Sequence, residues 1–235
     1  MKLPDIGPYV VVGSHGAIGK ATISLLKSMN LPVIALWYRN APQGDFFRTI
    51  RADMSDFRSV CNTAAELLCE SERLSGLVYC AGSDPGNLSI ASAEQWHTTF
   101  SVNAIAPIIL SWELRHALNK GNGSVAIVGS VAANIATPNV VYGSSKAALV
   151  AAVRSTAWSL AEFGVRINVV NPGPVASTMT AQWSDSERLD RIQRTALKRI
   201  GCPEDIADAI LFLLANESRH ITGIAMDVSG GFELR

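Results

Sequence analysis

The 235-residue chain has few cysteines, no excess of either charge and no long apolar run. Its four cysteines, at positions 61, 69, 80 and 202, form no CxxC pair and no zinc-site spacing, so we predict reduced thiols and no metal. Lys plus Arg and Asp plus Glu both number 20, which excludes broad electrostatic attraction to nucleic acid or to an anionic membrane. No apolar stretch reaches roughly 18 residues, and no signal peptide is recognisable. These absences predict a cytoplasmic protein.

The residues that are present favour a compact core. Apolar residues make up 48% of the chain and charged residues 17%, a balance that argues against disorder. Single α/β domains often reach this length before the core divides. We therefore predict one domain over residues 1–235.

Short β-branched runs alternate with helix-length segments along the whole chain. The expected strands are Tyr9–Val12, Pro32–Trp37, Phe47–Arg51, Gly76–Cys80, Ser124–Val128, Arg166–Val170 and Ile224–Val228. The expected helices cover 17–29, 56–72, 92–119, 140–163 and 203–215. This alternation predicts an α/β fold, a doubly wound, seven-stranded, mostly parallel sheet with helices on both faces. The polar segment 177–197 is expected to lie as a loop over a site.

A glycine-rich loop containing Gly13, Gly16 and Gly19 separates the first expected strand from the first helix. Glycines let backbone N–H groups approach a pyrophosphate, which the helix N-terminus then stabilises. A loop used only for packing is one alternative. A Walker phosphate loop is another, but Ser14 stands where its first glycine is needed and Ala21 where Ser or Thr should hold magnesium. A dinucleotide is the better ligand.

The end of the second expected strand bears on which dinucleotide binds. A carboxylate there favours NAD, whereas an arginine suits the 2′-phosphate of NADP. The stretch Leu36–Asn40 has no carboxylate and contains Arg39, which could also be a surface charge. Asp53 could receive the adenine amino group or cap the following helix. We predict NADP, with NAD as the alternative.

Tyr142 and Lys146 stand four residues apart in an expected helix. At that spacing a phenol and an ammonium share one face, with Cβ atoms roughly 5–6 Å apart. If this Tyr-x-x-x-Lys spacing stood alone, the alternative would be a Tyr–Lys pair exposed to solvent with no catalytic role. Two polar residues upstream favour a site: Ser130 ends an expected strand, and Asn103 lies inside the expected long helix.

Together with further motifs in the same order, these residues span the chain from about residue 8 to residue 232. In this pattern the chain resembles the short-chain dehydrogenase/reductase family. The resemblance is to its shorter branch, which includes 3-oxoacyl-carrier-protein reductases, and it implies a Rossmann-type fold. The displaced glycines also resemble the longer branch of epimerases and dehydratases, but 235 residues leave no room for its C-terminal region. The matching motifs are Gly13–Gly19, Ala52–Asp56, Cys80–Gly82, Trp96 to Asn103, Gly129–Ser130, Tyr142–Lys146, Asn171–Gly173, Arg199–Ala207 and Ser229–Gly231.

The resemblance implies a role for each of four catalytic residues. Tyr142 would be the general acid in reduction and the base in oxidation. Lys146 would lower the Tyr142 pKa and bind the nicotinamide ribose. Ser130 would donate a hydrogen bond to the substrate carbonyl, and Asn103 would hold a water of the proton relay. The oxidised nicotinamide would lower the Tyr142 pKa further, because one opposite charge shifts a pKa by only about 1–3 units.

The resemblance also implies the residues that contact cofactor and substrate. The chain departs from the family pattern at Val12, Ala17, Cys80 and Ser229, and Gly16 stands where many NADP-dependent relatives carry a second basic residue. The substrate would meet Ser130, Ile135, Tyr142 and Trp183, with Met179 nearby. The cofactor would contact Gly13, His15, Gly16, Ala17, Ile18, Gly19, Arg39, Asp53, Met54, Ala81, Gly82, Asn103, Tyr142, Lys146, Pro172, Gly173, Val175, Ser177 and Thr178.

The expected function is that of an NADP-dependent oxidoreductase acting on a ketone, an aldehyde or a secondary alcohol. A non-catalytic cofactor-binding regulator or scaffold on the same fold is the alternative. Arg188, Arg191 and Arg194 recur at helical spacing and are interpreted as a solvated helix face. Relatives commonly pair the helix that begins near Tyr142 across a subunit interface, so we expect a homo-oligomer, a tetramer or a dimer.

Overall fold

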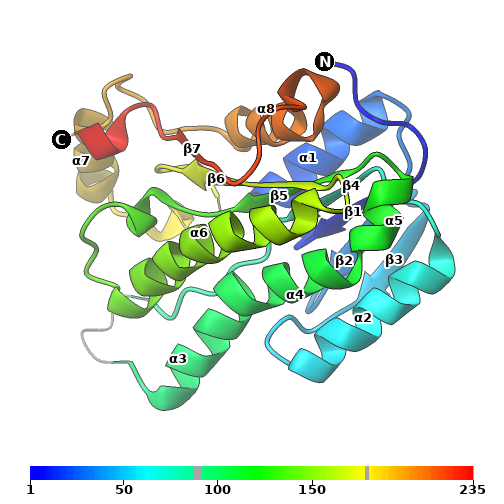
Figure 1. Cartoon of the computed structure of the whole chain (residues 1–235). Coiled ribbons are helices and arrows are strands. Elements are labelled where there is room, and N and C mark those ends of the chain that lie inside the picture. Colours follow the sequence, from blue (N-terminus) through cyan, green and yellow to red (C-terminus); the bar gives the residue numbers. More distant parts are fainter. Residues whose placement is uncertain (87–90, 178–179, 235) are drawn as a thin grey trace.

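The computed structural model describes residues 1–86, 91–177 and 180–234. They form one α/β domain around a seven-stranded sheet in the order β3-β2-β1-β4-β5-β6-β7 (Figure 1). Every neighbouring pair of strands is parallel, so the expectation of a mostly parallel sheet becomes a fully parallel one. The strands are β1 Tyr9–Val12, β2 Val33–Trp37, β3 Arg48–Arg51, β4 Gly76–Tyr79, β5 Ser124–Val128, β6 Arg166–Pro172 and β7 Ala225–Val228.

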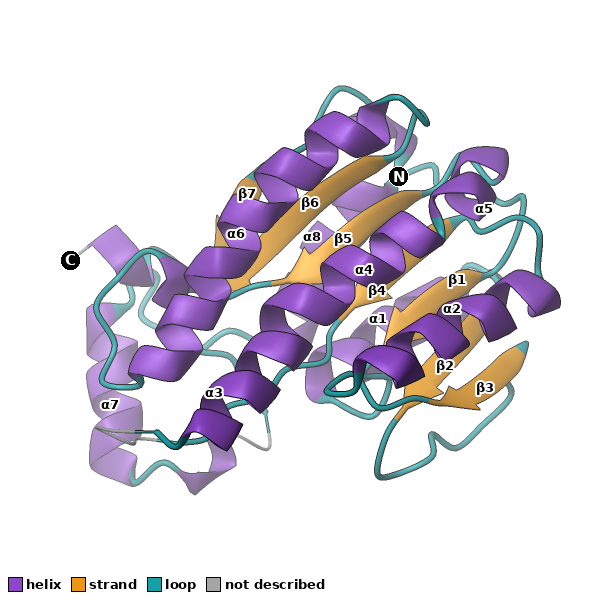
Figure 2. Ribbon diagram, turned by 60° about the horizontal axis from the view of Figure 1, so that its bottom comes forward, coloured by secondary structure: helices purple, strands orange, loops and turns teal. Residues whose placement is uncertain are grey.

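Helices cover both faces of this sheet. In Figure 2, α2, α4 and α6 lie in front of the strands, while α1 and α8 lie behind them. Side chains of β1 divide between the two resulting cores, because successive residues of a strand point to opposite faces: Val10 and Val12 join one core, Tyr9 and Val11 the other. The helices are α1 Ala17–Ser28, α2 Phe57–Glu70, α3 Ala93–Phe100, α4 Ala106–Glu113, α5 Arg115–Lys120, α6 Val140–Ala161, α7 Asp185–Arg194 and α8 Pro203–Leu214.

The single long helix expected over 92–119 is wrong, because the structure divides this segment. A π-helical turn at Ser101–Ile105 separates α3 from α4, and α4 ends at Glu113 before α5 begins. Pro107 sits in the first turn of α4 and has no N–H for the preceding ladder, so hydrogen bonding must be rearranged just before it.

The polar segment 177–197 is also more regular than a loop. It contains α7, which begins at a capping box formed by Ser184 and Glu187. Arg188, Arg191 and Arg194 all lie on this helix, none of whose residues is buried, as expected of a solvated face. No helix within the described residues combines the length and apolar character that crossing a membrane requires.

The strand order has its switch point at the centre of the sheet, between β1 and β4. From β1 the chain proceeds to β2 and β3 on one side, and from β4 to β7 on the other. At such a switch point the loops after neighbouring strands leave in opposite directions and open a space at the carboxyl edge. The loops that follow β1, β4, β5 and β6 all begin at this edge, because the strands are parallel.

The glycine loop offers a matched pair of substitutions. Gly13 has a φ of 79°, and a Cβ on it would lie 2.6 Å from the backbone nitrogen of Ala81. Gly16 has a φ of −67°, and a Cβ there would meet nothing closer than 3.4 Å. We expect Gly13→Ala to lower the free energy of unfolding by about 1–3 kcal/mol and Gly16→Ala to change it by less than about 0.5 kcal/mol. Urea unfolding measures both; equal losses would contradict this account.

Candidate active site

The loop after β1 is folded tightly at its ends and open in the middle. The N–H groups of Gly13 and Ser14 both donate to the carbonyl of Leu36 on β2, each at 3.1 Å. A Cβ on Gly19 would lie 2.4 Å from the carbonyl oxygen of Gly13, so that glycine serves close packing. The space beside Gly16 is open, and α1 begins directly after it with its first N–H groups exposed at the helix terminus. This cradle fits a pyrophosphate group.

The loops after β2 and β3 lie beside this cradle. Burial raises the pKa of Asp53, but hydrogen bonds from Ser55 and Tyr38 and the charge of Arg51 together hold it below its ordinary value. The Asp53 carboxylate accepts from the backbone N–H of Ser55 at 2.9 Å. The cap of α2 is Asp56, which accepts from two backbone N–H groups of the first turn. The capping alternative for Asp53 is therefore wrong, and its contact with the adenine stays a prediction.

Tyr142 and Lys146 come together with Ser130 at the carboxyl end of β5. The Ser130 hydroxyl lies close enough to the Tyr142 phenol to lower its pKa, and the Lys146 Nζ lies 5.8 Å from the centre of the phenol ring. Lys146 is only 3% exposed, and its Nζ donates to the carbonyl of Val128 at 2.9 Å. Asn139 caps α6 by accepting from the N–H of Tyr142 at 3.0 Å, which sets where the helix starts.

Burial dominates the electrostatics of this pair. It lowers the pKa of the Lys146 ammonium to about 8, because the charged form loses its hydration. Burial raises the pKa of Tyr142; the hydrogen bond from Ser130 lowers it, and the negative charge of Asp84 raises it again. The net shift of Tyr142 is upward. The resemblance implies that Lys146 and the oxidised nicotinamide together lower this pKa, whereas the group of this chain that lowers it here is Ser130.

Asn103 lies in the π-helical turn and connects two parts of the site. Its Oδ1 accepts from the N–H of Ser83 at 2.8 Å, and its Nδ2 donates to the Ser83 carbonyl and to Ser145 Oγ, each at 2.9 Å. The side chain is 1% exposed. Both Nδ2 hydrogens are used, so any water must bind the carboxamide oxygen or the backbone. The side chain thus ties the loop after β4 to α6.

Two residues missed by sequence analysis position Ser130. Its backbone N–H donates to Asn171 Oδ1 at 3.0 Å, and Asn171 Nδ2 donates to Asp227 at 2.9 Å. A Cβ on Gly129 would lie 2.1 Å from the same Asn171 oxygen, which explains the glycine before the serine. The motif that contains Asn171 was a signal for it. Nothing in the sequence indicates Asp227, because its contact arises from the register of β6 with β7.

Other predicted contacts occupy the same edge. Pro172 ends β6, and the Gly173 N–H donates to the Val228 carbonyl at 3.2 Å. Ser177 hydrogen-bonds with Thr180, close to Val175. Burial raises the pKa of the Cys80 thiol to about 12, so this residue is neutral beside Lys146. Thr178 and Met179 lie outside the described residues.

Two substrate predictions fall on different parts of the molecule. Ile135 lines a hollow of about 290 Å³ together with residues of α6, and neither Ser130 nor Tyr142 lines it. Trp183 lies before α7, with the Arg191 guanidinium 5.0 Å from its ring centre. Within the part of the chain that the structure describes, no group of three His, Cys, Asp or Glu residues could hold a metal ion.

Known proteins are similar to this chain over nearly its whole length. The family model described as enoyl-(acyl carrier protein) reductase matches residues 36–233. The 2,3-dihydro-2,3-dihydroxybenzoate dehydrogenase of Bacillus subtilis is 30% identical, over 95% of each chain. The 3-oxoacyl-[acyl-carrier-protein] reductase of Rickettsia typhi is 28% identical, over 94% of this chain and 95% of its own. The solved structure of 4-hydroxyisoleucine dehydrogenase complexed with NADH has a TM-score of 0.90 at 24% identity, over 97% and 99% of the two chains.

The fold and the site define a dinucleotide-binding α/β oxidoreductase, and the chain belongs to the short-chain dehydrogenase/reductase family. It is an NAD(P)-dependent enzyme that acts on alcohol or carbonyl groups. The resemblance stated from the motifs is confirmed, and the regulator on the same fold gives way to the enzyme.

Proposed function

We propose that the enzyme prefers NADP and that Tyr142 exchanges the proton of the substrate oxygen. The observation that carries this proposal is the meeting of Ser130, Tyr142 and Lys146 at the carboxyl end of β5. A phenol that lies near a serine hydroxyl and a buried ammonium is suited to giving and taking one proton.

The residues divide the chemistry between them. The nicotinamide supplies or accepts the hydride when it is bound. Ser130 donates a hydrogen bond to the substrate oxygen, and its position is held through the Asn171 amide. Tyr142 gives that oxygen a proton in reduction and removes it in oxidation. Lys146 stabilises the phenolate that oxidation needs, and it offers N–H donors to ribose hydroxyls.

The preference for NADP rests on the end of β2. Strand β2 ends at Trp37, and Tyr38 and Arg39 follow it. The chain therefore has no carboxylate at the position from which one would accept hydrogen bonds from both ribose hydroxyls of NAD. A carboxylate would also repel a 2′-phosphate, whereas the exposed guanidinium of Arg39 offers it charge-assisted hydrogen bonds.

Replacing the phenol tests the proton assignment. Tyr142→Phe removes one hydroxyl from a helix that Asn139 still caps, so fold and cofactor affinity should persist. Proton transfer by a positioned group typically contributes 10²–10⁴-fold, and turnover with a panel of ketones should fall by at least about 100-fold. A variant that keeps more than a tenth of the wild-type rate would show that another group carries the proton.

The charges around Tyr142 predict a direction for the pH profile. Asp84 raises the Tyr142 pKa, Ser130 lowers it, and Lys146 lies on the same helix. Asp84→Asn removes the negative charge and favours the phenolate, so alcohol oxidation should begin at lower pH than in the wild type. The dependence of kcat/KM on pH measures this shift. The exposed Asp45→Asn is the control, and a profile unmoved by Asp84→Asn would exclude the coupling.

We further propose a homo-oligomer built on the outer face of α6. Figures 1 and 2 show this face uncovered by other elements of the described chain. Val140, Ser144, Ala147 and Ala151 form a stripe at helical spacing, and the 290 Å³ hollow lies at its N-terminal end. At the other end stands Trp158, which is 83% exposed. Two antiparallel copies of α6 related by a two-fold axis would place each tryptophan at the partner's hollow.

Trp158→Ser should therefore weaken the assembly. Light scattering at micromolar concentration should give a mass of at least twice 25.1 kDa for the wild type and a smaller mass for the variant. Leu189→Ser on α7 removes another exposed apolar side chain and should leave the mass unchanged. A monomeric wild type would refute the oligomer, and an unchanged Trp158 variant would refute this interface.

A further inference from the structure

A second guanidinium lies beside the backbone that carries Arg39. Arg51 is the last residue of β3, in register with Trp37 of β2. Its Nε donates to the carbonyl oxygen of Tyr38 at 3.3 Å, and this carbonyl belongs to the peptide that joins Tyr38 to Arg39. This hydrogen bond holds the Arg51 side chain, which comes from β3, beside the loop after β2 that contains Arg39.

Both guanidinium groups are available to a ligand. Arg39 and Arg51 are exposed, and neither forms an ion pair with a carboxylate anywhere in residues 1–86, 91–177 or 180–234. The charge of Arg51 helps to lower the pKa of Asp53, and an oxygen of that carboxylate already accepts hydrogen bonds from Ser55. The hydrogen bond to the Tyr38 carbonyl holds the Arg51 Nε beside the residue that precedes Arg39, and both cations would attract an anion bound there.

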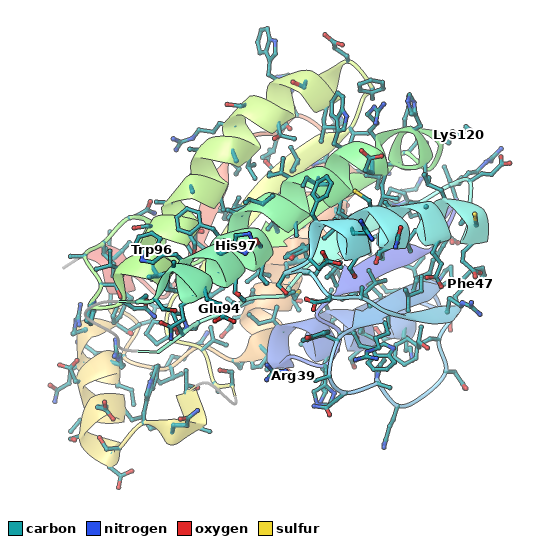
Figure 3. The ribbon with its side chains drawn as sticks, turned by 90° about the horizontal axis from the view of Figure 1, so that it is seen from below. Arg39, Phe47, Glu94, Trp96, His97 and Lys120 are labelled. Carbon is teal, nitrogen blue, oxygen red and sulfur yellow. The ribbon has the colours of Figure 1, made fainter. Side chains whose placement is uncertain are left out.

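The opposite end of the same strand provides a contrast. Arg48 begins β3, and its guanidinium pairs with Glu70 at 3.1 Å and with Glu66 at 3.8 Å on α2. Figure 3 shows the two ends of this sheet edge, with Phe47, the residue before Arg48 in the sequence, at one end and Arg39 at the other. The two arginines of β3 therefore have different environments: one is neutralised by α2, and the other points to the cofactor edge.

We propose that Arg51 is a specificity-determining residue that binds the 2′-phosphate of the adenosine ribose together with Arg39. This inference rests on the proposed preference for NADP. A phosphomonoester has three oxygens and close to two negative charges at neutral pH, enough to accept from two guanidinium groups. Gly16 leaves position 16 of the glycine loop without a basic side chain, and Arg51 supplies a second guanidinium from β3 instead.

Direct binding tests this without relying on turnover. Isothermal titration of the full-length chain would use NADP⁺, NAD⁺, adenosine 2′,5′-bisphosphate, 5′-AMP and inorganic phosphate as probes. The variants are Arg51→Gln, Arg39→Gln, the double variant and Arg48→Gln as the matched control from the same strand. Thermal unfolding of each variant establishes that it is folded.

Arg51→Gln should weaken NADP⁺ and the 2′-phosphorylated fragment by roughly tenfold or more, the effect of losing one charge-assisted hydrogen bond. The Kd for NAD⁺ and 5′-AMP should change by less than about twofold, and Arg48→Gln should change no Kd by more than this. High salt should reduce the difference between the two cofactors in the wild type. Inorganic phosphate that binds as tightly as the 2′-phosphorylated fragment would indicate an unspecific anion site and overturn the proposal.

The preference for NADP and the role of Arg51 are refuted by different results. If the wild type prefers NADP⁺ and Arg51→Gln keeps that preference while Arg39→Gln loses it, the cofactor preference stands and the role of Arg51 is wrong. Equal weakening of both dinucleotides by Arg51→Gln would also overturn the role, because the residue would then only support the end of β2. A wild type that binds NAD⁺ more tightly overturns both.

Discussion

The ammonium of Lys146, buried at the end of β5, is the constraint on which the rest of the site depends. Removing a charge of this size from water costs several kcal/mol, and one backbone carbonyl repays only part of it. The hydrogen bond to Val128 nevertheless fixes where α6 crosses the sheet. Once that crossing is set, Tyr142 lies one helical turn earlier and faces the hydroxyl of Ser130. The same burial lowers the pKa of Lys146.

The remaining parts of the site exist because backbones approach one another closely. A side chain on Gly13 would collide with the loop after β4, and one on Gly129 would displace the amide that holds Ser130. At Gly143 a Cβ would lie 2.5 Å from Thr137, so the loop after β5 also packs directly on α6. These approaches bring four loops from different strands to one edge. The polar side chains then complete an arrangement that the glycines have made possible.

Sequence patterns predicted much of this and missed specific parts for identifiable reasons. Strand positions follow from β-branched runs, and the observed strands differ from the expected ones by two residues at most. The break at Pro107 was missed because the apolar pattern continues through it. The four proposed catalytic positions could be named from the sequence because they lie in ordered motifs that resemble those of the family. Asp227 and Arg51 could not be found in this way, because each contact depends on which strands are neighbours.

A net charge of zero also conceals how charge is distributed along the crevice. Equal totals of acidic and basic residues exclude a long-range attraction, but they do not prevent local separation. Arg39 and Arg51 lie at the ends of β2 and β3, whereas Asp84 follows β4 beside Tyr142. The ends of β2 and β4 are about two strand spacings apart, roughly 10 Å, and the ends of β3 and β4 about three, roughly 14 Å, all at the same edge. Such a separation lowers the free energy of an elongated anionic ligand in one orientation, with its most charged end toward the arginines.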